Sequence, residues 1–463
     1  MLQPSESRRS VAMQRQTRQL WRSTLSLLGT VGLIASSFSI TTSSISAQTS
    51  GSAQPCLSGD PFQLAALKTK LSQVNPPSGV QRVNRTLTVE FITTGVLTDE
   101  APTMPVLPTE VGDDEPYERE PVPASTATFR VFNTLTLNEF RVVMQASTVG
   151  TIRDCYERND LLNGKIPTDY TGDIDAPPPP QRSKQTEVFT PFGWSNGDDN
   201  RELKTNHTQF PLRTISQFSR VSGNQDSNCT GTFVGPRHLI TAAHCINREA
   251  TNVWFTTKVT PGRNGTGTGS APYNSTVIMP NPQPPVESWY WTFEEWRDPN
   301  QNNRTRWDIG MIVVPDRLGD TTSWMGVAPR TATYLKNTTS YNRGYPNCNG
   351  DGATRGNAPA GCQVARMYGD PGNCGARWFK NLDGDGWSRR YDVKCDASAG
   401  HSGSPVYHYE YSAHHGKDIP VVSAVIITEE CFTCSNLNSY VNTVRRVTPS
   451  VIDNYVALRE IFN

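Results

Sequence analysis

The sequence predicts an all-β protein of short antiparallel strands, arranged as a sandwich or barrel, with one helix at the C-terminal end. Glycine and proline number 35 and 34 among 463 residues, about twice the share that a long helical protein carries. Short runs of alternating apolar and polar residues recur after Phe189, separated by clusters of Gly, Pro, Asn and Asp. The clearest runs are 210–218, 232–242, 309–314 and 421–428.

The C-terminal helix is predicted from its first turn and its apolar spacing. Thr448 precedes Pro449, which is the order of an N-cap residue and a proline at the first helical position. Four apolar or aromatic residues then recur every three or four positions: Val451, Tyr455, Leu458 and Phe462. This spacing puts them on one face, so we expect the helix to pack that face against the barrel.

The first part of the chain has the order of a secretory signal peptide. Five arginines between residues 8 and 22 precede an apolar run over 25–40, and a Ser/Thr-rich stretch ends at Ala47. The run is short and serine-rich for a membrane span, and an uncleaved anchor is the alternative. Ten cysteines, an even number, fit disulfides in an exported chain. We expect residues 1–47 to be removed, leaving a secreted or periplasmic protein without membrane attachment.

Residues 48–185 have a different texture from the rest. Two stretches predict strands or short helices, 87–96 and 126–149, and an acidic, proline-rich stretch lies between them. A second proline-rich stretch, 173–184, contains four consecutive prolines, which block strand pairing and favour an extended connector. The sequence therefore predicts a mixed, partly disordered pro-region or accessory domain over 48–185. The second unit is predicted over 186–463.

The charge of the chain excludes some classes of partner. Lys plus Arg and Asp plus Glu both number 43, so the net charge is zero. A surface for nucleic acid or a polybasic membrane patch is therefore not expected as its main function.

Three fragments of the second unit carry residues suited to acyl transfer: His244 after a hydrophobic run, Asp308 before another, and Ser402 between Gly400 and Gly403. Acyl transfer needs a hydroxyl nucleophile, an imidazole base, a carboxylate that fixes its tautomer, and amide donors for the oxyanion. Each fragment alone is more often a turn, a core histidine or a strand cap. Their occurrence together in one β-rich unit favours catalysis.

The motifs around these residues resemble those of chymotrypsin-like serine peptidases. They are the stretch from Cys229 to Pro236, the sequence Thr241-Ala242-Ala243-His244-Cys245, and Gly400-His401-Ser402-Gly403-Ser404-Pro405. The Ser-Gly-Ser-Pro context is similar to the bacterial glutamyl endopeptidase branch. Over about 190–463, the resemblance implies a double six-stranded antiparallel β-barrel with the catalytic groups between the barrels. It also implies a monomer that acts on protein or peptide substrates.

The resemblance assigns roles to individual residues. Ser402 is the implied nucleophile, His244 the general base and Asp308 its orienting carboxylate, while the amides of Gly400 and Ser402 form the oxyanion hole. A disulfide between Cys229 and Cys245 is implied behind the histidine. A second is expected between Cys395 and Cys431 beside the specificity pocket, with Cys434 as the alternative partner. The spacing of Cys431 and Cys434 also leaves zinc binding as an alternative.

The sequence departs from the family at two positions. In the trypsin group an Asp before the nucleophile pairs with the freed N-terminus, but here that position is His401. The pocket wall over 424–429 lacks the histidine expected in glutamyl endopeptidases. The predicted pocket residues are Asp396, Ile426, Thr428 and Glu429. A buried Asp396, six residues before Ser402, would favour Arg or Lys in the substrate, although an Asp there is often a turn cap.

One further motif concerns cofactors. Asp383-Gly384-Asp385-Gly386 has the look of part of a calcium loop, but no distal Glu completes it, so a turn is the simpler interpretation. No other metal or cofactor is expected. The sequence thus predicts a secreted serine endopeptidase made as a precursor, whose pro-region assists folding or blocks the cleft. A peptidase-like binding or adhesion module, and an esterase on the same scaffold, are the alternatives.

Overall fold

A computed structural model describes the chain over 64–102, 107–108, 126–145, 150, 163–172, 201–222, 226–301, 303–348, 358–359, 361–370, 374–380, 387–431 and 440–462. The predicted signal peptide, the connector at 173–184 and the calcium-like turn at 383–386 lie outside these residues, as do Cys56, Cys155 and Cys434. Residues from Ser52 to Asn463 form one compact unit.

The larger of two main sheets has eleven strands, all paired antiparallel with their neighbours. Their order is β1 (Gly79–Arg82), β2 (Leu87–Thr94), β6 (Asn138–Gln145), β5 (Thr126–Asn133), β14 (Trp289–Phe293), β15 (Gly310–Val313), β10 (His238–Thr241), β9 (Cys229–Phe233), β8 (Ile215–Ser219), β12 (Thr257–Pro261) and β13 (Thr276–Ile278). The predicted run 232–242 contains the end of β9 and the whole of β10. The predicted run 309–314 contains β15, which lies between β14 and β10.

The second sheet has eight strands. Its path is β17 (Ser340–Asn342), β21 (Pro405–Ser412), β22 (Lys417–Cys431), β23 (Tyr440–Arg446), β20 (Arg390–Val393) and β19 (Ala376–Phe379), and β16 (Gly326–Val327) and β4 (Leu107–Pro108) pair with β22 in parallel. Two small pairs complete the strands: β3 (Val96–Thr98) with β11 (Val253–Phe255), and β7 (Glu202–Leu203) with β18 (Tyr368–Gly369). The predicted all-β class is confirmed.

Among the residues that the structure describes, helices are few and mostly short. They are α1 (Leu64–Leu71), α3 (Glu294–Arg297), α4 (Leu318–Thr322), α5 (Ala332–Asn337), α7 (Pro449–Ile461), and the 3-10 turns η3 (Leu212–Thr214), η4 (Ala243–Cys245) and η5 (Arg304–Trp307). Within the described ranges, no helix is long and apolar enough to span a bilayer.

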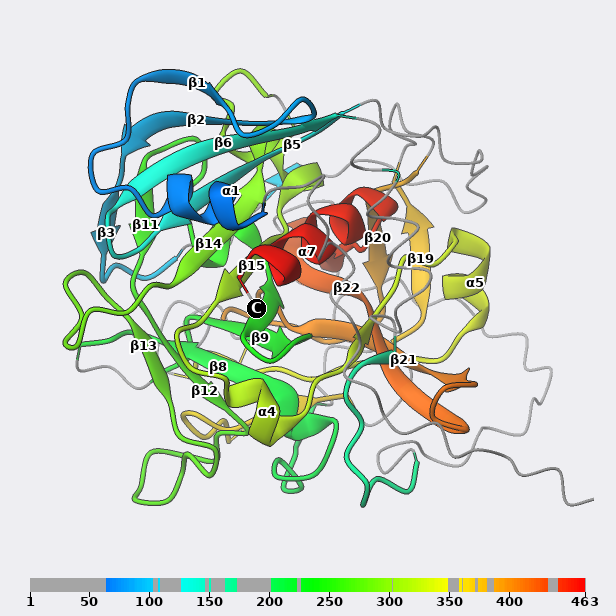
Figure 1. Cartoon of the computed structure of the whole chain (residues 1–463). Helices are drawn as coiled ribbons and strands as arrows, with labels where there is room; N and C mark the ends of the chain where they lie inside the picture. The colour runs from blue at the N-terminus through cyan, green and yellow to red at the C-terminus, as the bar shows by residue number, and fades with distance from the viewer. Residues whose placement is uncertain are drawn as a thin grey trace, which may run out of the picture. The chain divides into compact units, whose positions relative to one another are not determined.

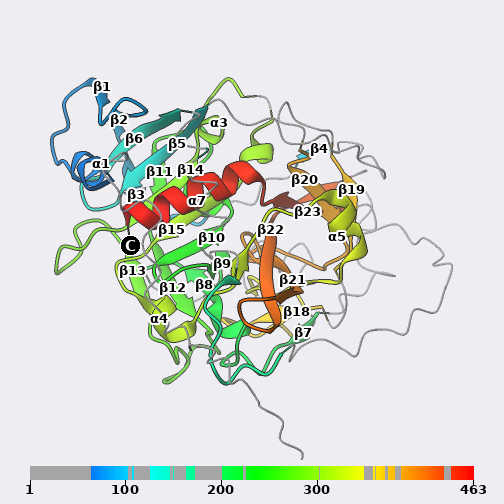
Figure 2. The ribbon, with the colours of Figure 1, turned by 45° about the vertical axis from the view of Figure 1, so that its right-hand side comes forward.

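The predicted C-terminal helix is α7. Its four stripe residues, Val451, Tyr455, Leu458 and Phe462, are all buried. Phe462 stacks on Trp289 with ring centroids 4.5 Å apart, and the Tyr455 hydroxyl donates to the carbonyl of Val234. Thr448 holds the predicted N-cap position and Pro449 the first helical position, although the Thr448 side chain makes no capping hydrogen bond. Figure 2 shows α7 (red) running from the second sheet to strands of the first.

Strands that precede the predicted boundary extend the sheet that follows it. β5 pairs with β14 over five residue pairs, from Trp289 opposite Asn133 to Phe293 opposite Phe129. Figures 1 and 2 show β2, β6 and β5 continuing the sheet beyond β14. Phe132 also stacks on Trp254 with ring centroids 4.7 Å apart. The sequence predicted separate units on either side of residue 185, but the described strands share one sheet and one core.

Three disulfides lie within the described residues: Cys229–Cys245, Cys348–Cys362 and Cys374–Cys395. The first was predicted and is confirmed. The predicted pairing of Cys395 with Cys431 is wrong, because the chain between β18 and β19 brings Cys374 to Cys395 instead. Since the sulfurs of Cys348, Cys362, Cys374 and Cys395 are all bonded in pairs, they are not thiolates, and the zinc site that needed them loses its ligands.

Candidate active site

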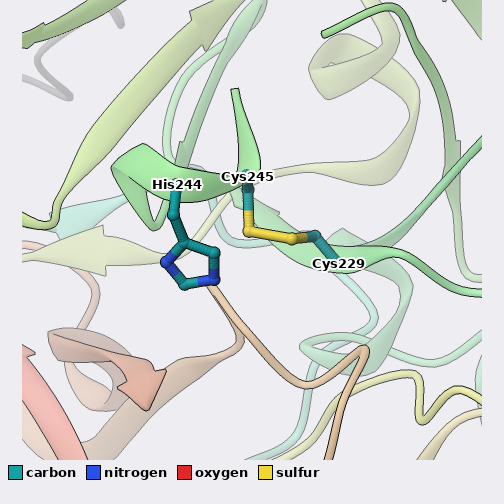
Figure 3. Close-up of side chains that lie close together, drawn as sticks. All are labelled: Cys229, His244 and Cys245. Atoms are coloured by element: carbon teal, nitrogen blue, oxygen red, sulfur yellow. A yellow bond between two sulfur atoms is a disulfide. The ribbon is translucent and has the colours of Figure 1, made fainter. Parts of the chain in front are cut away.

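His244 lies in the η4 turn that directly follows β10. The Cys229–Cys245 disulfide ties this turn to β9, and Figure 3 shows the imidazole projecting from the turn beside the disulfide. The side chain is only 5% exposed. The position of the imidazole is therefore set by a strand end and a covalent link, which is the rigid support that a catalytic base requires.

Asp308 holds His244 at two points. It stands between η5 and β15, and Gly310 at the start of β15 is paired with Thr241 at the end of β10. Asp308 Oδ1 accepts the backbone N–H of His244 at 2.9 Å, and Oδ2 lies 2.7 Å from His244 Nδ1. The carboxylate is fully buried. It therefore favours the tautomer with the proton on Nδ1, which leaves the Nε2 lone pair as the basic site.

The other ring nitrogen of His244 is poised to take a proton. Nε2 is buried, and it has no hydrogen-bond partner among the described residues. An unpaired imidazole nitrogen in a buried position is unfavourable for structure alone. A substrate complex that brings a hydroxyl to Nε2 would satisfy it.

Residues 396–404 form the loop that carries Ser402, called the serine loop below. Its turn from Gly400 to Ser404 depends on two glycines with left-handed backbone. The φ angles of Gly400 and Gly403 are 92° and 81°. A Cβ at Gly400 would lie 2.5 Å from the carbonyl oxygen of Tyr345, and one at Gly403 would lie 2.3 Å from that of Thr230. Neither position accepts a side chain, so the glycines predicted to form the tight turn are sterically required.

Thr230 on β9 attaches the serine loop to the strand beside the histidine turn. Its N–H donates to the Ser402 carbonyl at 2.8 Å, and its hydroxyl donates to the Gly400 carbonyl at 2.9 Å. The Cys245 sulfur also lies 3.5 Å from the Ser402 carbonyl oxygen. The structure thus brings the backbone of Ser402 against the disulfide next to His244. Sequence reasoning missed Thr230, although it stands in the motif that carried the family resemblance.

The amides of the serine loop divide into two groups. Those of His401, Gly403 and Ser404 donate to carbonyls of Ser398, Ile426 and His401, at 2.9, 2.7 and 2.8 Å. Among the residues that the structure describes, the amides of Gly400 and Ser402 have no acceptor. Two free amides in one turn can bind a developing oxyanion without reorganisation.

The pocket residues predicted from the sequence fall into two sets. Asp396 is partly exposed, and its N–H donates to both oxygens of Asp370 at 3.1 and 3.2 Å. Ile426 is fully buried in β22, while Thr428 and Glu429 pair through their backbone with Thr443 and Asn442 of β23. Asp370 was not predicted, because nothing in the sequence near residue 370 marks it as part of a site.

Two buried groups near the serine loop have shifted pKa values. Burial raises the pKa of Asp370 to about 7, and the negative charge of Asp396 adds to this effect. Burial also lowers the pKa of His401 well below its usual value, and the positive charge of Arg201 adds to that shift. His401 is therefore a neutral, fully buried imidazole at the position where the trypsin group has an aspartate.

Two clusters have the residue types of metal sites. They are Cys229 with His244 and Cys245, and Asp370 with Cys374 and Cys395. In both clusters the two sulfurs are bonded to each other as disulfides, so they do not offer thiolate ligands. The side chains around the candidate site are thus better suited to proton transfer than to holding a metal.

Residues 201–411 match the trypsin family. A glutamyl endopeptidase of Bacillus licheniformis is 32% identical over 151 residues, covering 32% of this chain and 41% of its own. An extracellular metalloprotease of Bacillus subtilis is 27% identical, covering 32% and 44%. The serine protease ea of Drosophila melanogaster is 28% identical over 98 residues, covering 19% and 25%. The chain thus spans less than half the length of these relatives.

Among solved structures, a Glu endopeptidase is 19% identical, with a TM-score of 0.39, covering 57% of this chain and 98% of its own. The resemblance to chymotrypsin-like serine peptidases, and to glutamyl endopeptidases among them, is confirmed by the family match and the sequence relative. The matched segment contains His244, Asp308 and Ser402, the residues to which the resemblance assigned the chemistry.

Proposed function

We propose that the protein is a serine endopeptidase that cleaves peptide bonds through an acyl-enzyme on Ser402. The observation that carries this proposal is the double hydrogen bond from His244 to the buried carboxylate of Asp308. It leaves Nε2 as a free base, in a segment that matches a serine peptidase family. The two free amides of the serine loop support the same chemistry.

The reaction proceeds in two acyl transfers. Ser402 Oγ attacks the substrate carbonyl while His244 Nε2 takes its proton, and Asp308 stabilises the imidazolium that forms. The negative charge on the carbonyl oxygen is held by the amides of Gly400 and Ser402. His244 then gives the proton to the departing amine. A water molecule repeats the sequence on the acyl-enzyme and releases Ser402.

Cleavage after Arg or Lys is the specificity that we propose. Asp396 stands six residues before Ser402 in sequence, and the carboxylate of Asp370 lies next to its backbone. If Asp396 lies at the floor of the specificity pocket, its carboxylate attracts a cationic side chain and repels glutamate. Glutamate preference is the alternative, because relatives of this chain include a glutamyl endopeptidase.

The protein is further proposed to be secreted and made as a precursor. Its signal-like N-terminus supports export, and one relative is named as extracellular. The pro-region extends over 48–185 in this proposal, with cleavage near Arg182 or Lys184. The pairing of β5 with β14 indicates that residues 64–145 stay with the enzyme after such a cut.

A serine-directed fluorophosphonate separates the enzyme from a binding module on the same fold. The processed wild-type protein should be labelled at Ser402, and S402A should not. S216A is a matched control, because Ser216 is also a buried serine but lies in β8. Equal labelling of wild type and S402A, or none of either, overturns the proposal. Sequencing the products of a peptide library then distinguishes a peptidase from an esterase and reports the preferred residue.

A further inference from the structure

A buried arginine, Arg201, contacts the serine loop from a segment far away in sequence. Arg201 is 7% exposed, and it stands one residue before β7. We propose that Arg201 is a positioning residue that orders the serine loop from inside the chain, so that no freed N-terminus is needed for this task. The inference rests on the proposed function, since the loop it orders carries Ser402.

The pairing of β7 with β18 brings Arg201 to this place. Leu203 lies opposite Tyr368 and Glu202 opposite Gly369, and Lys204 N–H donates to the Met367 carbonyl at 2.9 Å. Continuing this register by one residue puts Arg201 opposite Asp370. A two-residue strand thus brings a guanidinium next to a buried carboxylate that is 169 positions away in sequence.

Arg201 holds the turn that carries the two free amides. Its Nη1 donates to the hydroxyl of Ser398 at 2.7 Å, and Ser398 is fully buried. The carbonyl of Ser398 in turn accepts the His401 N–H at 2.9 Å, which closes the turn containing Gly400. A charge-assisted bond at the first residue of this turn restrains the backbone from which the Gly400 and Ser402 amides project.

Asp370 completes the anchor at the start of the loop. Its carboxylate accepts the N–H of Asp396 two residues before Ser398. The positive charges of Arg201 and Arg343 act on Asp370 and oppose the effect of burial on its pKa. The buried cation therefore has a buried anion beside it, as a charge in the interior requires. Arg201 and Asp370 together hold the loop at residues 396 and 398.

His401 does not order the serine loop through an ion pair. Both of its ring nitrogens are buried with no hydrogen-bond partner among the described residues, and its pKa is lowered. A neutral imidazole cannot form the ion pair that an aspartate makes at this position with a freed α-amine. Arg201 also lies downstream of Arg182 and Lys184, so it remains in the chain after the proposed cleavage.

The first test measures loop order without relying on activity. In hydrogen–deuterium exchange of the full chain, R201M should exchange the hydrogen-bonded amides of the serine loop, those of Asp396, His401, Gly403 and Ser404, at least about tenfold faster than wild type. R330M is the control, because Arg330 is a half-buried arginine whose carboxylate partner, Glu410, lies in β21. Unchanged exchange of the loop in R201M overturns the inference, whether or not the protein is an enzyme.

The second test measures catalysis in the processed protein. R201M should lower kcat by about 100-fold with KM changed less than about threefold, because the oxyanion donors are displaced while the pocket stays in place. R201K should recover about tenfold, since it restores the charge but not the fork of donors. If R201M does not fold, S398A removes the acceptor alone, and a loss of kcat below about twofold in S398A overturns the inference.

A third arm tests the α-amine itself. Selective acetylation of the N-terminal amine of the processed wild type should leave the rate of fluorophosphonate labelling unchanged. A loss of labelling on acetylation shows that the amine orders the loop, and it overturns the inference while leaving the proposed function intact. Absence of labelling in untreated wild type instead counts against the proposed function, and the exchange measurement still decides the role of Arg201.

Discussion

The buried carboxylate of Asp308 accepts both the backbone N–H and the Nδ1–H of His244, at 2.9 and 2.7 Å. One bond fixes the turn and the other fixes the ring, so the imidazole keeps one tautomer and one orientation. The two residues come from different strand ends, and the pairing of β10 with β15 holds those ends together. The orientation of His244 Nε2 therefore depends on the Asp308 carboxylate, and removing the negative charge of Asp308 should disturb it.

D308N should lower kcat by about 10⁴-fold with little change in fold, because an amide at this position favours the wrong tautomer of His244. The rate of hydrolysis of a peptide amide measures this effect. D320N is the control, since Asp320 forms an exposed pair with Arg317 and should leave kcat within about twofold of wild type. A D308N enzyme with more than a tenth of wild-type kcat would show that Asp308 has no orienting role.

Glu139 should be among the most important charges for stability. It is fully buried, and it pairs with Arg297 at 2.7 Å and Arg130 at 3.2 Å. E139Q removes the carboxylate partner of the buried Arg297 and one of the two that pair with Arg130, so the free energy of unfolding should fall by about 3–5 kcal/mol. Urea unfolding measures the change. Arg297 also donates to Asn247, which follows the histidine turn, so catalysis should fall together with stability.

E90Q is the matched control for this ion network. Glu90 pairs with Arg141 on the neighbouring strand, and their side chains are 24% and 37% exposed. A pair in contact with solvent should contribute no more than about 1 kcal/mol. Similar losses in E90Q and E139Q would contradict a special role for the buried network.

Acidification should destabilise the fold through His238. This residue is fully buried in β10, and burial, together with the charges of Arg459, Arg237 and Arg317, lowers its pKa well below the usual value. Below about pH 6.5 the unfolded chain therefore takes up a proton that the folded chain does not, so stability falls as the pH falls. The loss attributable to His238 approaches about 1.4 kcal/mol per pH unit below that point.

Urea unfolding of wild type and H238N at pH 7.5 and pH 5.0 checks this prediction. The wild type should lose more stability between the two pH values than H238N does, because the variant lacks the titrating group. H414N is the control, since His414 is an exposed histidine between β21 and β22. Equal losses in wild type and H238N would show that other groups cause the acid effect.

Local motifs made the candidate catalytic residues predictable from the sequence, but the contacts that support them could not be predicted in this way. His244 and Ser402 stand in short sequences whose glycines and strand ends fix the backbone nearby, so the sequence alone singled them out. The partners of Arg201 and Cys395 depend on how distant segments meet. Eight cysteines admit 105 pairings, and a two-residue strand such as β7 has no periodicity to read.

For the strands within 79–145, the sequence predicted the strands themselves but not the strands they pair with. The alternation over 87–96 and 126–149 predicted strands or short helices, and the structure has the strands β2, β3, β5 and β6 there. Alternation reports that a strand has a buried face, but it does not report which strand lies beside it. The proline-rich stretch at 173–184 favoured a boundary between separate units. The pairing of β5 with β14 overrides that signal, because it buries Phe129 and Phe132 against residues of the matched segment.

Cleavage within 173–200 should therefore yield two chains that remain together. Besides the β5–β14 ladder, Asp99 accepts the N–H groups of Val221 and Ser222, and Arg130 pairs with Glu294. After the cut, the fragment containing 64–145 should co-elute with the fragment containing 201–462 in gel filtration and separate only in denaturant. W254A, which removes the ring that stacks on Phe132, should weaken the association, whereas W378A is the control. Trp378 lies in β19 of the second sheet. Free release of the fragment at neutral pH without denaturant would show that it is a removable pro-region, because a strand built into the sheet leaves only when the sheet opens.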